Sequence, residues 1–380
     1  MNTLPIIIVG GGLAGLAMAN ALAIRGLSSV VLEKTKSPGD IDRGDVLHRS
    51  TILLLKSWGV QERLQTYNPF QFSRFQIFDN NGKEIFTIDI DQSLDPTAKF
   101  LVLRHPMIES FLEETATSTG LTSIMRGVSC SDLIIRGERV VGVNTSIGII
   151  ESDLTIIANG AKSVLRDKYF KGRLFHDYFI SFYNARYRSK RDFGNVGFYV
   201  IGEAGIMIFV ALPNQEVRIG LQCGRRERVH PEHAENMIRA RLKTFPVHDL
   251  EFVDAHLYPV TMSLSNHLHI PGAVLIGDAA HTVHPVGGQG GNLAFQDAEM
   301  LAQYIAENST SIEALDNACK AYSINRHRQL KAILFRIHFF AQWSLLKNPL
   351  LINLRQKFLW LANKSDFIKK LIFRRIVDVR

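Results

Sequence analysis

Apolar residues near the start of the chain form short unbroken runs rather than alternating patterns. Residues 5–9 (PIIIV) make one run, and residues 29–32 (SVVL) make a second, mostly apolar one. Runs of this length are typical of strands that are buried on both faces, as in a parallel sheet covered by helices. The segment between them is rich in alanine and leucine and ends at Gly26, as expected for a helix that packs closely on such a sheet. The pattern predicts a β-α-β unit over residues 5–33.

Three glycines mark the turn between this first strand and its helix. Gly10 permits the turn, Gly12 lets a pyrophosphate approach the backbone, and Gly15 lets helix and strand pack closely. Glu33 directly follows the second apolar run, where a carboxylate accepts hydrogen bonds from a ribose 2′-hydroxyl. This arrangement predicts a dinucleotide site, and Glu33 favours FAD or NAD over a 2′-phosphorylated cofactor. The alternative is a glycine-rich turn with a structural role alone.

A similar pattern recurs late in the chain. The apolar run 273–276 is followed by Gly277 and Asp278, and residues 287–291 contain four glycines among five positions. A helical pattern then runs from about Asn292. Glycine destabilises a helix by about 1 kcal/mol relative to alanine, so these glycines clear space for something that approaches the backbone. Two distant strand-glycine-helix segments predict contacts with two parts of one extended cofactor.

Two strand-rich stretches lie between these motifs. Residues 71–96 predict a hairpin with its turn at Asn80-Asn81-Gly82, and residues 172–269 contain several further strands. Residues 345–377 instead repeat apolar positions three and four apart among basic residues, which predicts amphipathic helices.

Composition and charge restrict the class of protein. Of the 380 residues 46% are hydrophobic and 21% charged, as in globular proteins. Segment 326–380 holds 13 basic and two acidic side chains, whereas the rest of the chain holds 31 basic and 34 acidic ones. A nearly neutral body excludes a nucleic-acid-binding core. The three cysteines have no metal-like or disulfide-like spacing, which fits a reducing compartment. We see no signal peptide and no apolar run long enough to span a bilayer.

Taken together, these motifs resemble class A FAD-dependent aromatic monooxygenases, which have the para-hydroxybenzoate hydroxylase fold. The resemblance covers the chain except its basic end and implies an α/β fold: a Rossmann-like FAD-binding domain, an inserted β-sheet substrate domain and C-terminal helices. The implied segments are 1–70, 97–171 and 270–325 for FAD, 71–96 and 172–269 for substrate, and 326–380 for basic amphipathic helices. By motif position, the implied cofactor-binding residues are Gly10, Gly12, Leu13, Ala14, Gly15, Glu33, Lys34, Arg43, Arg104, Val128, Asn159, Gly160, Gly277, Asp278, Pro285, Gly288, Gln289, Gly290, Gly291 and Asn292.

The chain departs from this family at its third motif. The family pattern Asp-Gly-x-x-Ser-x-x-Arg appears here with Asn159 in the place of the aspartate, while Gly160, Ser163 and Arg166 keep their positions. An amide cannot hold a negative charge against Arg166. Because the family uses this motif for both FAD and the pyridine nucleotide, the choice between NADH and NADPH stays open. A tolerated replacement and a changed reductant are the two alternatives.

Substrate and catalytic residues are harder to predict. The resemblance implies a sheet that roofs the substrate over the flavin, with Ile180, Phe182, Phe209 and Pro285 as candidate pocket residues. Since half of all strand positions face the other way, ordinary core positions are the alternative. His48 is the candidate side-chain base. His281-x-x-His284 and His230-x-x-His233 suggest a metal site, but no cysteine or carboxylate cluster completes either pair, so we expect no metal.

The resemblance implies a single-component enzyme with non-covalent FAD that uses NADPH or NADH and O2. It would hydroxylate an electron-rich aromatic or heteroaromatic small molecule through a flavin C4a-hydroperoxide, in secondary metabolism. The alternatives are a flavin-dependent epoxidase or reductase of a lipophilic alkene, and a non-catalytic flavoprotein that shelters a ligand.

The basic tail, residues 345–377, carries a prediction of its own. One interpretation is a helical cap packed on the flavin domain; the other is peripheral contact with an anionic membrane. We expect a cytoplasmic protein, with that contact at the inner face of a membrane.

Overall fold

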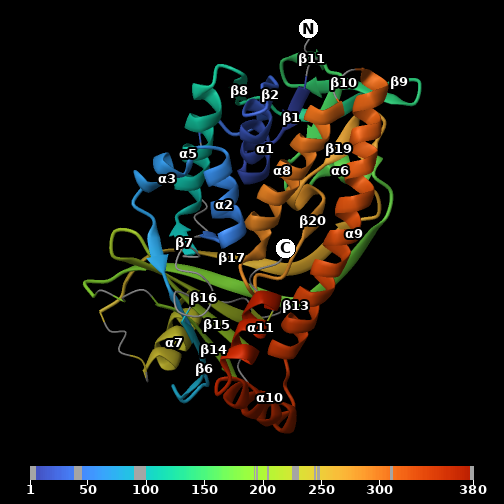
Figure 1. Cartoon of the computed structure of the whole chain (residues 1–380). Coiled ribbons are helices and arrows are strands. Elements are labelled where there is room, and N and C mark those ends of the chain that lie inside the picture. Colours follow the sequence, from blue (N-terminus) through green and yellow to red (C-terminus); the bar gives the residue numbers. More distant parts are fainter. Residues whose placement is uncertain are drawn as a thin grey trace.

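The structure of the chain is a computed structural model (Figure 1). It describes residues 6–37, 45–89, 100–191, 193, 196–202, 205–224, 231–243, 245, 249–308 and 311–376.

A mostly parallel sheet forms one layer, with strand order β18-β19-β12-β1-β2-β8. Its strands are β1 (Ile6–Val9), β2 (Ser29–Glu33), β8 (Thr122–Arg126), β12 (Leu154–Ile157), β18 (His269–Ile270) and β19 (Ala273–Leu275). β1 pairs in parallel with both β2 and β12, and β12 pairs in parallel with β19. All residues of β1, β12 and β19 are buried, which confirms that the unbroken apolar runs are central strands.

Helices cover this sheet, and two of them begin at the glycine-rich motifs. The helices of this half are α1 (Leu13–Ala23), α2 (Arg49–Ser57), α3 (Gln61–Gln65), α5 (His105–Ser118), α6 (Val164–Tyr169), α8 (Gln289–Asn308) and α9 (Ile312–Ser344). Every residue of α1 except Ala14 is buried, because its small side chains let it pack between the sheet and α8. α8 begins at Gln289, slightly before the predicted start at Asn292.

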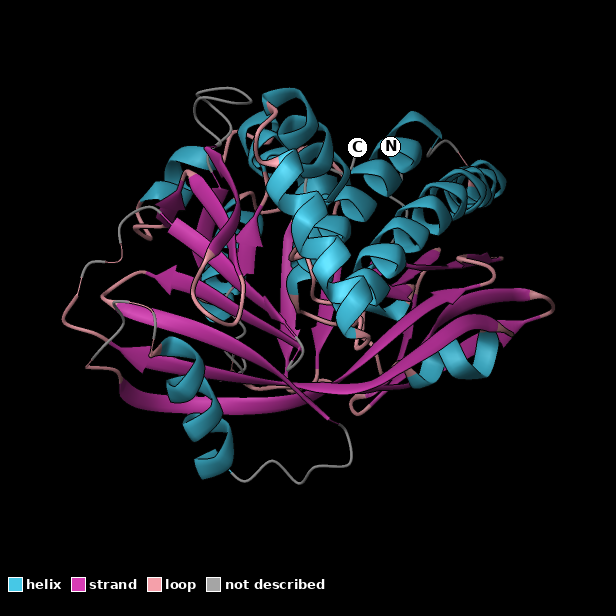
Figure 2. Cartoon of the chain, turned by 90° about the horizontal axis from the view of Figure 1, so that it is seen from below, coloured by secondary structure: helices cyan, strands magenta, loops and turns pink. Residues whose placement is uncertain are grey.

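A second, mixed sheet of eight strands crosses the molecule with most of the helices gathered on one side of it (Figure 2). Its order is β20-β17-β13-β16-β15-β14-β5-β6. The strands are β5 (Arg74–Phe78), β6 (Glu84–Asp89), β13 (Arg173–Arg188), β14 (Val196–Gly202), β15 (Gly205–Leu212), β16 (Glu216–Gly224), β17 (Glu251–Ser265) and β20 (His281–Thr282). The predicted hairpin is therefore confirmed, and β5 joins it to the later strands by pairing in parallel with β14.

Smaller elements complete the fold. β3 (Asp45–Leu47), β7 (Phe100–Leu103) and β4 (Phe70–Phe72) form one three-stranded sheet, and β11 (Gly148–Glu151), β10 (Arg139–Thr145) and β9 (Cys130–Arg136) form another. A short 3-10 helix, η1 (Gly277–Ala279), follows β19. The remaining helices are α7 (Pro231–Leu242), α10 (Pro349–Ala362) and α11 (Asp366–Ile376).

Three apolar clusters hold these layers together. The largest lies between the parallel sheet and its helices. A second lies between the eight-stranded sheet and α7, and a third joins the β5–β6 hairpin to α10. The α/β class predicted from the sequence is confirmed.

Candidate active site

The two glycine-rich segments, which lie at opposite ends of the sequence, meet in space. A Cβ placed on Gly291 at the start of α8 would lie 3.4 Å from Leu13 Cδ1 at the start of α1. A Cβ on Gly277 would lie 2.5 Å from Ala14 Cβ. The amino ends of two helices and the turn after β19 thus converge. Helix amino ends carry free N–H groups and partial positive charge, so this junction suits an anionic ligand.

Two of the three glycines in the first motif are required by the protein itself. Gly10 has φ +111°, and a Cβ there would lie 2.5 Å from Ala158 O. A Cβ on Gly15 would overlap the carbonyl oxygen of Gly10. Gly12 differs, because the nearest atom to its Cβ position is Glu109 Oε1 at 3.6 Å. A Cβ on Gly12 would thus make only an ordinary van der Waals contact, so no clash within the described protein requires glycine there.

Glu33 ends β2 beside this motif. Its Oε2 accepts a hydrogen bond from Gly11 N (2.7 Å), and its Oε1 accepts one from Thr35 N (2.8 Å). Burial acts to raise the pKa of this carboxyl, but the hydrogen bonds from the Thr35 and Gly11 amides outweigh it and lower the pKa overall. Val128 N donates to the Glu33 carbonyl (3.0 Å), and Lys34 is exposed just beyond. The carboxylate is thus ionised and oriented next to the motif.

The second glycine loop is open along most of its length. Gly288 has φ +60°, and the nearest atom to its Cβ position is His48 Nε2 at 3.7 Å. The nearest to that of Gly290 is Val283 Cγ2, also at 3.7 Å. Gly288 N closes the turn by donating to Pro285 O (3.0 Å). No steric contact within the described protein requires Gly290 to lack a side chain, whereas the positive φ of Gly288 by itself favours glycine.

A buried carboxylate that we did not predict holds this loop to the parallel sheet. Asp297 is fully buried and accepts hydrogen bonds from Gly277 N (2.8 Å), His281 Nε2 (2.8 Å) and Arg326 Nε (2.6 Å). Burial alone would raise the pKa of Asp297, but His281 and Arg326 lower it to about 2. Asp278, next to Gly277, has no hydrogen-bond or ion-pair partner among the described residues. Asp297 lies two turns into α8 on its inner face, a position that helical periodicity marks as buried.

The third motif lies against the first. Ser163 caps α6 by accepting from Arg166 N (3.1 Å), and the Arg166 guanidinium contacts Asp167 and Ala279 O. Asn159 Oδ1 is buried and has no hydrogen-bond partner among the residues that the structure describes. Gly160 has φ +83° and nothing within 4 Å of its Cβ position. An unpaired buried oxygen beside an open glycine is the pattern expected where a ligand completes the site.

Comparison with known proteins identifies the family. The family model described as "FAD binding domain" matches residues 3–336. The chain belongs to this family, the class A FAD-dependent aromatic monooxygenases. It is 26% identical to 3-demethoxyubiquinol 3-hydroxylase of Escherichia coli strain K12, over 81% of each chain. It is 25% identical to 6-methylpretetramide 4-monooxygenase of Streptomyces rimosus, over 77% of this chain and 73% of that one.

A solved structure extends the likeness to nearly the whole chain. The crystal structure of p-nitrophenol 4-monooxygenase from Pseudomonas putida DLL-E4 aligns with a TM-score of 0.84 over 99% of both chains, at 18% identity. The family resemblance inferred from the motifs is therefore confirmed. The chain is a flavin-dependent monooxygenase with FAD as its cofactor.

The side chain of Asn292 is hydrogen-bonded entirely within the protein. Its Oδ1 accepts from His48 N (2.8 Å) and Thr51 Oγ1 (2.7 Å), and its Nδ2 donates to Val46 O (2.8 Å) and Gly288 O (2.8 Å). The amide has used its full hydrogen-bonding capacity within the protein. The side chain ties the glycine loop to the start of α2, and contact of Asn292 with the flavin stays a prediction.

His48 lies at that same junction. It is buried, its ring meets the edge of Phe100 at a centroid distance of 5.3 Å, and its Nε2 is the atom nearest to the Cβ position of Gly288. The structure thus brings the candidate base to the open glycine loop. Gln289, the first residue of α8, is buried at the same loop.

The candidate pocket residues divide between two faces of the large sheet. Phe182 stacks on Tyr258 (6.2 Å between centroids) and meets the edge of His284 (6.1 Å), so it lies on the side of the glycine loop. Ile180, two positions earlier in β13, shares that strand face. Phe209 instead belongs to the cluster under α7, on the opposite face. The prediction that Phe209 lines the pocket is wrong, because its position in β15 turns it away.

Of the two arginines predicted to bind the cofactor, the structure describes only one. Arg104 directly precedes α5, and its Nε lies 4.0 Å from Glu216 Oε2 of the large sheet. It therefore lies where the end of β7 approaches the eight-stranded sheet. Arg43 lies outside the described residues.

Neither histidine pair forms a metal centre in the described part of the chain. His281 bonds Asp297, and His284 Nδ1 accepts from Val286 N (3.1 Å). Burial and the nearby His338 lower the pKa of His284 to about 3, so its ring is neutral. The described residues contain no group of three or more potential metal ligands, and His230 lies outside them.

A charged cluster between the two glycine loops was not predicted from the sequence. His105 lies between Asp45 and Glu109, with its Nε2 3.1 Å from Glu109 Oε1 and its Nδ1 hydrogen-bonded to Asp45. Burial lowers the pKa of His105, but the two carboxylates raise it to about 10. Glu109 faces the Gly12 position and Asp45 faces Gly291. Nothing in the linear order of these residues signals that they meet.

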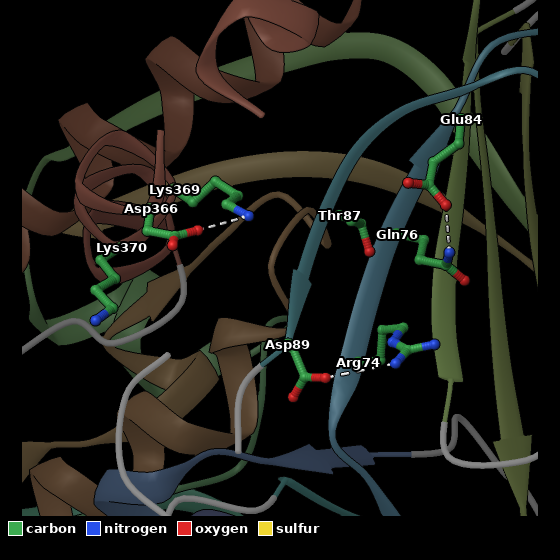
Figure 3. A pocket seen from close by; sticks show the side chains of 8 residues that line it. All are labelled: Arg74, Gln76, Glu84, Thr87, Asp89, Asp366, Lys369 and Lys370. Carbon is green, nitrogen blue, oxygen red and sulfur yellow. Dashed lines mark hydrogen bonds and ion pairs between the residues drawn. The ribbon is translucent and has the colours of Figure 1, made fainter. Parts of the chain in front are cut away.

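A separate surface cavity of about 460 Å³ lies between the β5–β6 hairpin and α11 (Figure 3). Its lining residues are Arg74, Gln76, Glu84, Thr87, Asp89, Asp366, Lys369 and Lys370. Most of these side chains pair with one another, as in the Arg74–Asp89 (3.4 Å) and Asp366–Lys369 (2.8 Å) contacts. None of the predicted FAD residues lines it, so we do not assign the cofactor there.

Proposed function

We propose that the chain hydroxylates an electron-rich aromatic or heteroaromatic small molecule with NAD(P)H and O2, as a single-component enzyme of secondary metabolism. The balance is substrate, O2, NAD(P)H and a proton giving hydroxylated substrate, NAD(P)⁺ and water. The observation that carries the proposal is the aromatic surface of Phe182 and Tyr258, which lies on the side of the open glycine loop. Flat apolar side chains suit a flat apolar substrate.

The described residues fit FAD in three places. The space at Gly12, with the amides that begin α1, would receive the pyrophosphate, and Glu33 would accept from a ribose hydroxyl. Asp278, which lacks a partner among the described residues, would accept from a ribityl hydroxyl. The open positions at Gly288 and Gly290 would leave room for the isoalloxazine ring beside the amino end of α8.

When bound, FAD supplies the redox chemistry that takes electrons from NAD(P)H and activates O2. The protein contributes position and charge. The amino end of α8 favours negative charge near the glycine loop, and the Asp297 network holds that loop in register with the parallel sheet. Phe182 and its neighbours would exclude water from the substrate. His48 stays the candidate group to take a proton from a phenolic substrate.

Product analysis with isotopic oxygen tests this proposal. The holoprotein is mixed with NADH or NADPH and a panel of phenols, anilines and hydroxylated heteroaromatics under ¹⁸O2. We expect at least one compound to accelerate NAD(P)H oxidation and to gain one labelled oxygen. A product without the label, or reduction of substrate with no oxygen gained, would overturn the proposal. Phe182→Ala should raise KM more than it lowers flavin content, whereas Phe209→Ala should act on stability.

The reductant is tested through the third motif. Because Asn159 Oδ1 is buried and unpaired, Asn159→Asp restores the family carboxylate without displacing a protein hydrogen bond. We expect the variant to fold and retain FAD, and the rate of flavin reduction by NADH or NADPH to change severalfold. Equal rates in both proteins, measured by anaerobic stopped-flow, would show that the replacement is neutral.

The cellular location stays a prediction. No helix within the described ranges is both long and apolar enough to cross a membrane. The cytoplasmic location and the peripheral membrane contact at residues 345–377 were inferred from the sequence alone.

A further inference from the structure

Helix α10 exposes an apolar face to solvent. Five large side chains on one side of the helical wheel form a stripe, with exposed fractions between 46% and 75%: Leu350, Leu351, Leu354, Phe358 and Leu361, called here the α10 stripe. A surface helix of a globular protein normally turns such a stripe inward and presents polar residues outward. Single exposed leucines are common, but a continuous stripe marks a site of interaction.

The other face of α10 already packs against the protein, so the α10 stripe is not the face by which this helix joins the fold. Leu359 and Ala362 belong to the cluster that contains Ile85 and Phe86 of the β5–β6 hairpin. Asn363 Oδ1 accepts from Thr87 N (2.9 Å). The cap predicted from the sequence therefore exists, but it covers the substrate-side hairpin rather than the flavin domain. With one apolar face buried, a second apolar face remains.

The basic residues of this segment include both buried and exposed side chains, and Arg355 is a buried one. It is 2% exposed and donates to the carbonyls of Trp343 and Ser344 at the end of α9, where a cation is favourable. Arg355 therefore does not belong to the exposed basic residues of this segment. Lys347, Lys357 and Lys364 are exposed.

Apolar side chains on the two neighbouring helices enlarge the surface. Phe335 and Phe339 on α9 are 71% and 59% exposed, and Phe367 on α11 is 76% exposed. Figure 1 shows the end of α9, α10 and α11 gathered at one end of the molecule. Phe358 of the stripe meets Trp343 of α9 at a centroid distance of 5.9 Å. The α10 stripe is therefore adjacent to the end of α9.

Charge decides which partner fits. Segment 345–377 contains eight basic side chains and one acid, Asp366, which pairs with Lys369. Lys357 borders the α10 stripe on the helical wheel, and Lys364 Nζ lies 3.6 Å from the ring centre of Trp360. Aliphatic residues flanked by lysine and tryptophan are the composition of a helix that lies in a membrane interface. A purely apolar partner surface would not require the surrounding positive charge.

We propose that the α10 stripe docks on an anionic lipid bilayer, with α10 in the plane of the interface and its flanking lysines over acidic headgroups. No described helix could cross the bilayer, so the contact is peripheral. This docking goes beyond the hydroxylation reaction and does not depend on it. It would bring the substrate-side sheet, on which α10 packs, next to the lipid.

Vesicle flotation of the holoprotein tests the proposal. We expect flotation with phosphatidylcholine vesicles that contain about 30% phosphatidylglycerol at low salt, and loss of it in pure phosphatidylcholine or at high salt. Leu354→Ser with Phe358→Ser should weaken partitioning more than tenfold. Lys347→Gln, Lys357→Gln and Lys364→Gln should each weaken it about fivefold.

A pair of serine substitutions at exposed apolar residues far from α10 in the sequence controls for a general loss of surface hydrophobicity. Ile147 and Ile149 in the small β9–β11 region are 60% and 64% exposed, so Ile147→Ser with Ile149→Ser should leave flotation unchanged. All variants should retain flavin absorbance. Wild-type protein that stays with the soluble fraction at low salt would overturn the proposal, as would an equal loss in the control pair. A dimer in light scattering that the stripe variant alone abolishes, without vesicle binding, would assign the face to a second copy instead. Flotation needs no turnover, so its failure is distinguishable from failure of the hydroxylase assay.

Discussion

The two glycine-rich loops of this protein look alike in sequence but differ in what their glycines face. In the first loop, side chains at Gly10 and Gly15 would collide with backbone atoms of the protein itself. In the second, the Cβ positions of Gly288 and Gly290 have no neighbour closer than 3.7 Å. Gly12 in the first loop resembles the second loop in this respect, with its nearest neighbour at 3.6 Å. Gly288 has φ +60°, which favours glycine by itself, so Gly12 and Gly290 are the positions where access for a ligand is the remaining reason for glycine.

This difference matters for interpreting substitutions. Replacing a glycine that the fold requires should destabilise the protein, whether or not FAD is present. Replacing a glycine that has space in front of it should leave the apoprotein folded and lower its affinity for the cofactor. Three glycine substitutions separate these two classes, and a fourth substitution tests the charged cluster that lies between the loops.

Gly15→Ala should prevent stable folding. Its new methyl group would overlap the Gly10 carbonyl oxygen, where α1 packs on β1, and neither backbone can move without separating helix from sheet. We expect a loss of more than about 4 kcal/mol, seen as insoluble or molten protein by circular dichroism. Gly12→Ala is the matched control and should fold. A well-folded Gly15→Ala protein would contradict the packing described for this turn.

Gly12→Val should fold and lose FAD. The side chain would enter the space assigned to the pyrophosphate, while the extended backbone at Gly12 (φ −84°, ψ −171°) accommodates valine. We expect FAD affinity to fall at least about 100-fold, or roughly 3 kcal/mol, with little change in apoprotein unfolding. Fluorescence titration of apoprotein with FAD measures this. Wild-type affinity in the variant would show that the pyrophosphate lies elsewhere.

Gly290→Ala should change stability and affinity in opposite directions. Gly290 lies in the first turn of α8, where alanine stabilises a helix by up to about 1 kcal/mol. The same methyl group would point into the open space beside the glycine loop, so we expect FAD affinity to fall about tenfold. Thermal unfolding of the apoprotein and FAD titration test the two effects. If the thermal stability of the apoprotein and its affinity for FAD both rise, Gly290 does not face the cofactor.

His105→Asn should have an effect on stability that depends on pH. His105 lies between the two loops, and its carboxylate neighbours raise its pKa from 6.5 to about 10. A raised pKa in the folded state gives stability that is fully present below pH 6.5 and is lost as the pH rises through about 10. Wild type should therefore exceed the variant in urea-unfolding free energy at pH 6, and the gap should close towards pH 10. A gap that is constant over this range would mean that His105 is not charged.

Much of the cofactor half could be predicted because its signals are local. Unbroken apolar runs such as Ile6–Val9 identified central strands, and the spacing from Gly10 to Glu33 identified a dinucleotide turn. The β5–β6 hairpin also followed from its Asn-Asn-Gly turn. In each case residues close together in the sequence define the structure, so neighbouring side chains and local backbone geometry are sufficient to predict the element.

The substrate half was less predictable because strand alternation alone does not say which face is the inner one. Phe182 and Phe209 have similar surroundings in sequence, yet one lies near His284 and the other under α7. Asn292 was placed by its motif at the flavin, but its side chain bonds to the distant segment that contains Val46, His48 and Thr51. The motif located the residue and could not assign its partners.

The sequence by itself determined the fold class, the family and the two glycine-rich segments, since these depend on local periodicity and on backbone freedom at single residues. Only the tertiary structure decided which glycines face the protein and which face open space. It also assembled the Asp45–His105–Glu109 cluster and the Asp297 network, and it buried Arg355 while leaving the α10 stripe exposed. The physical reason is that burial and charge pairing depend on long-range packing, which brings together residues whose order in the chain does not indicate that they meet.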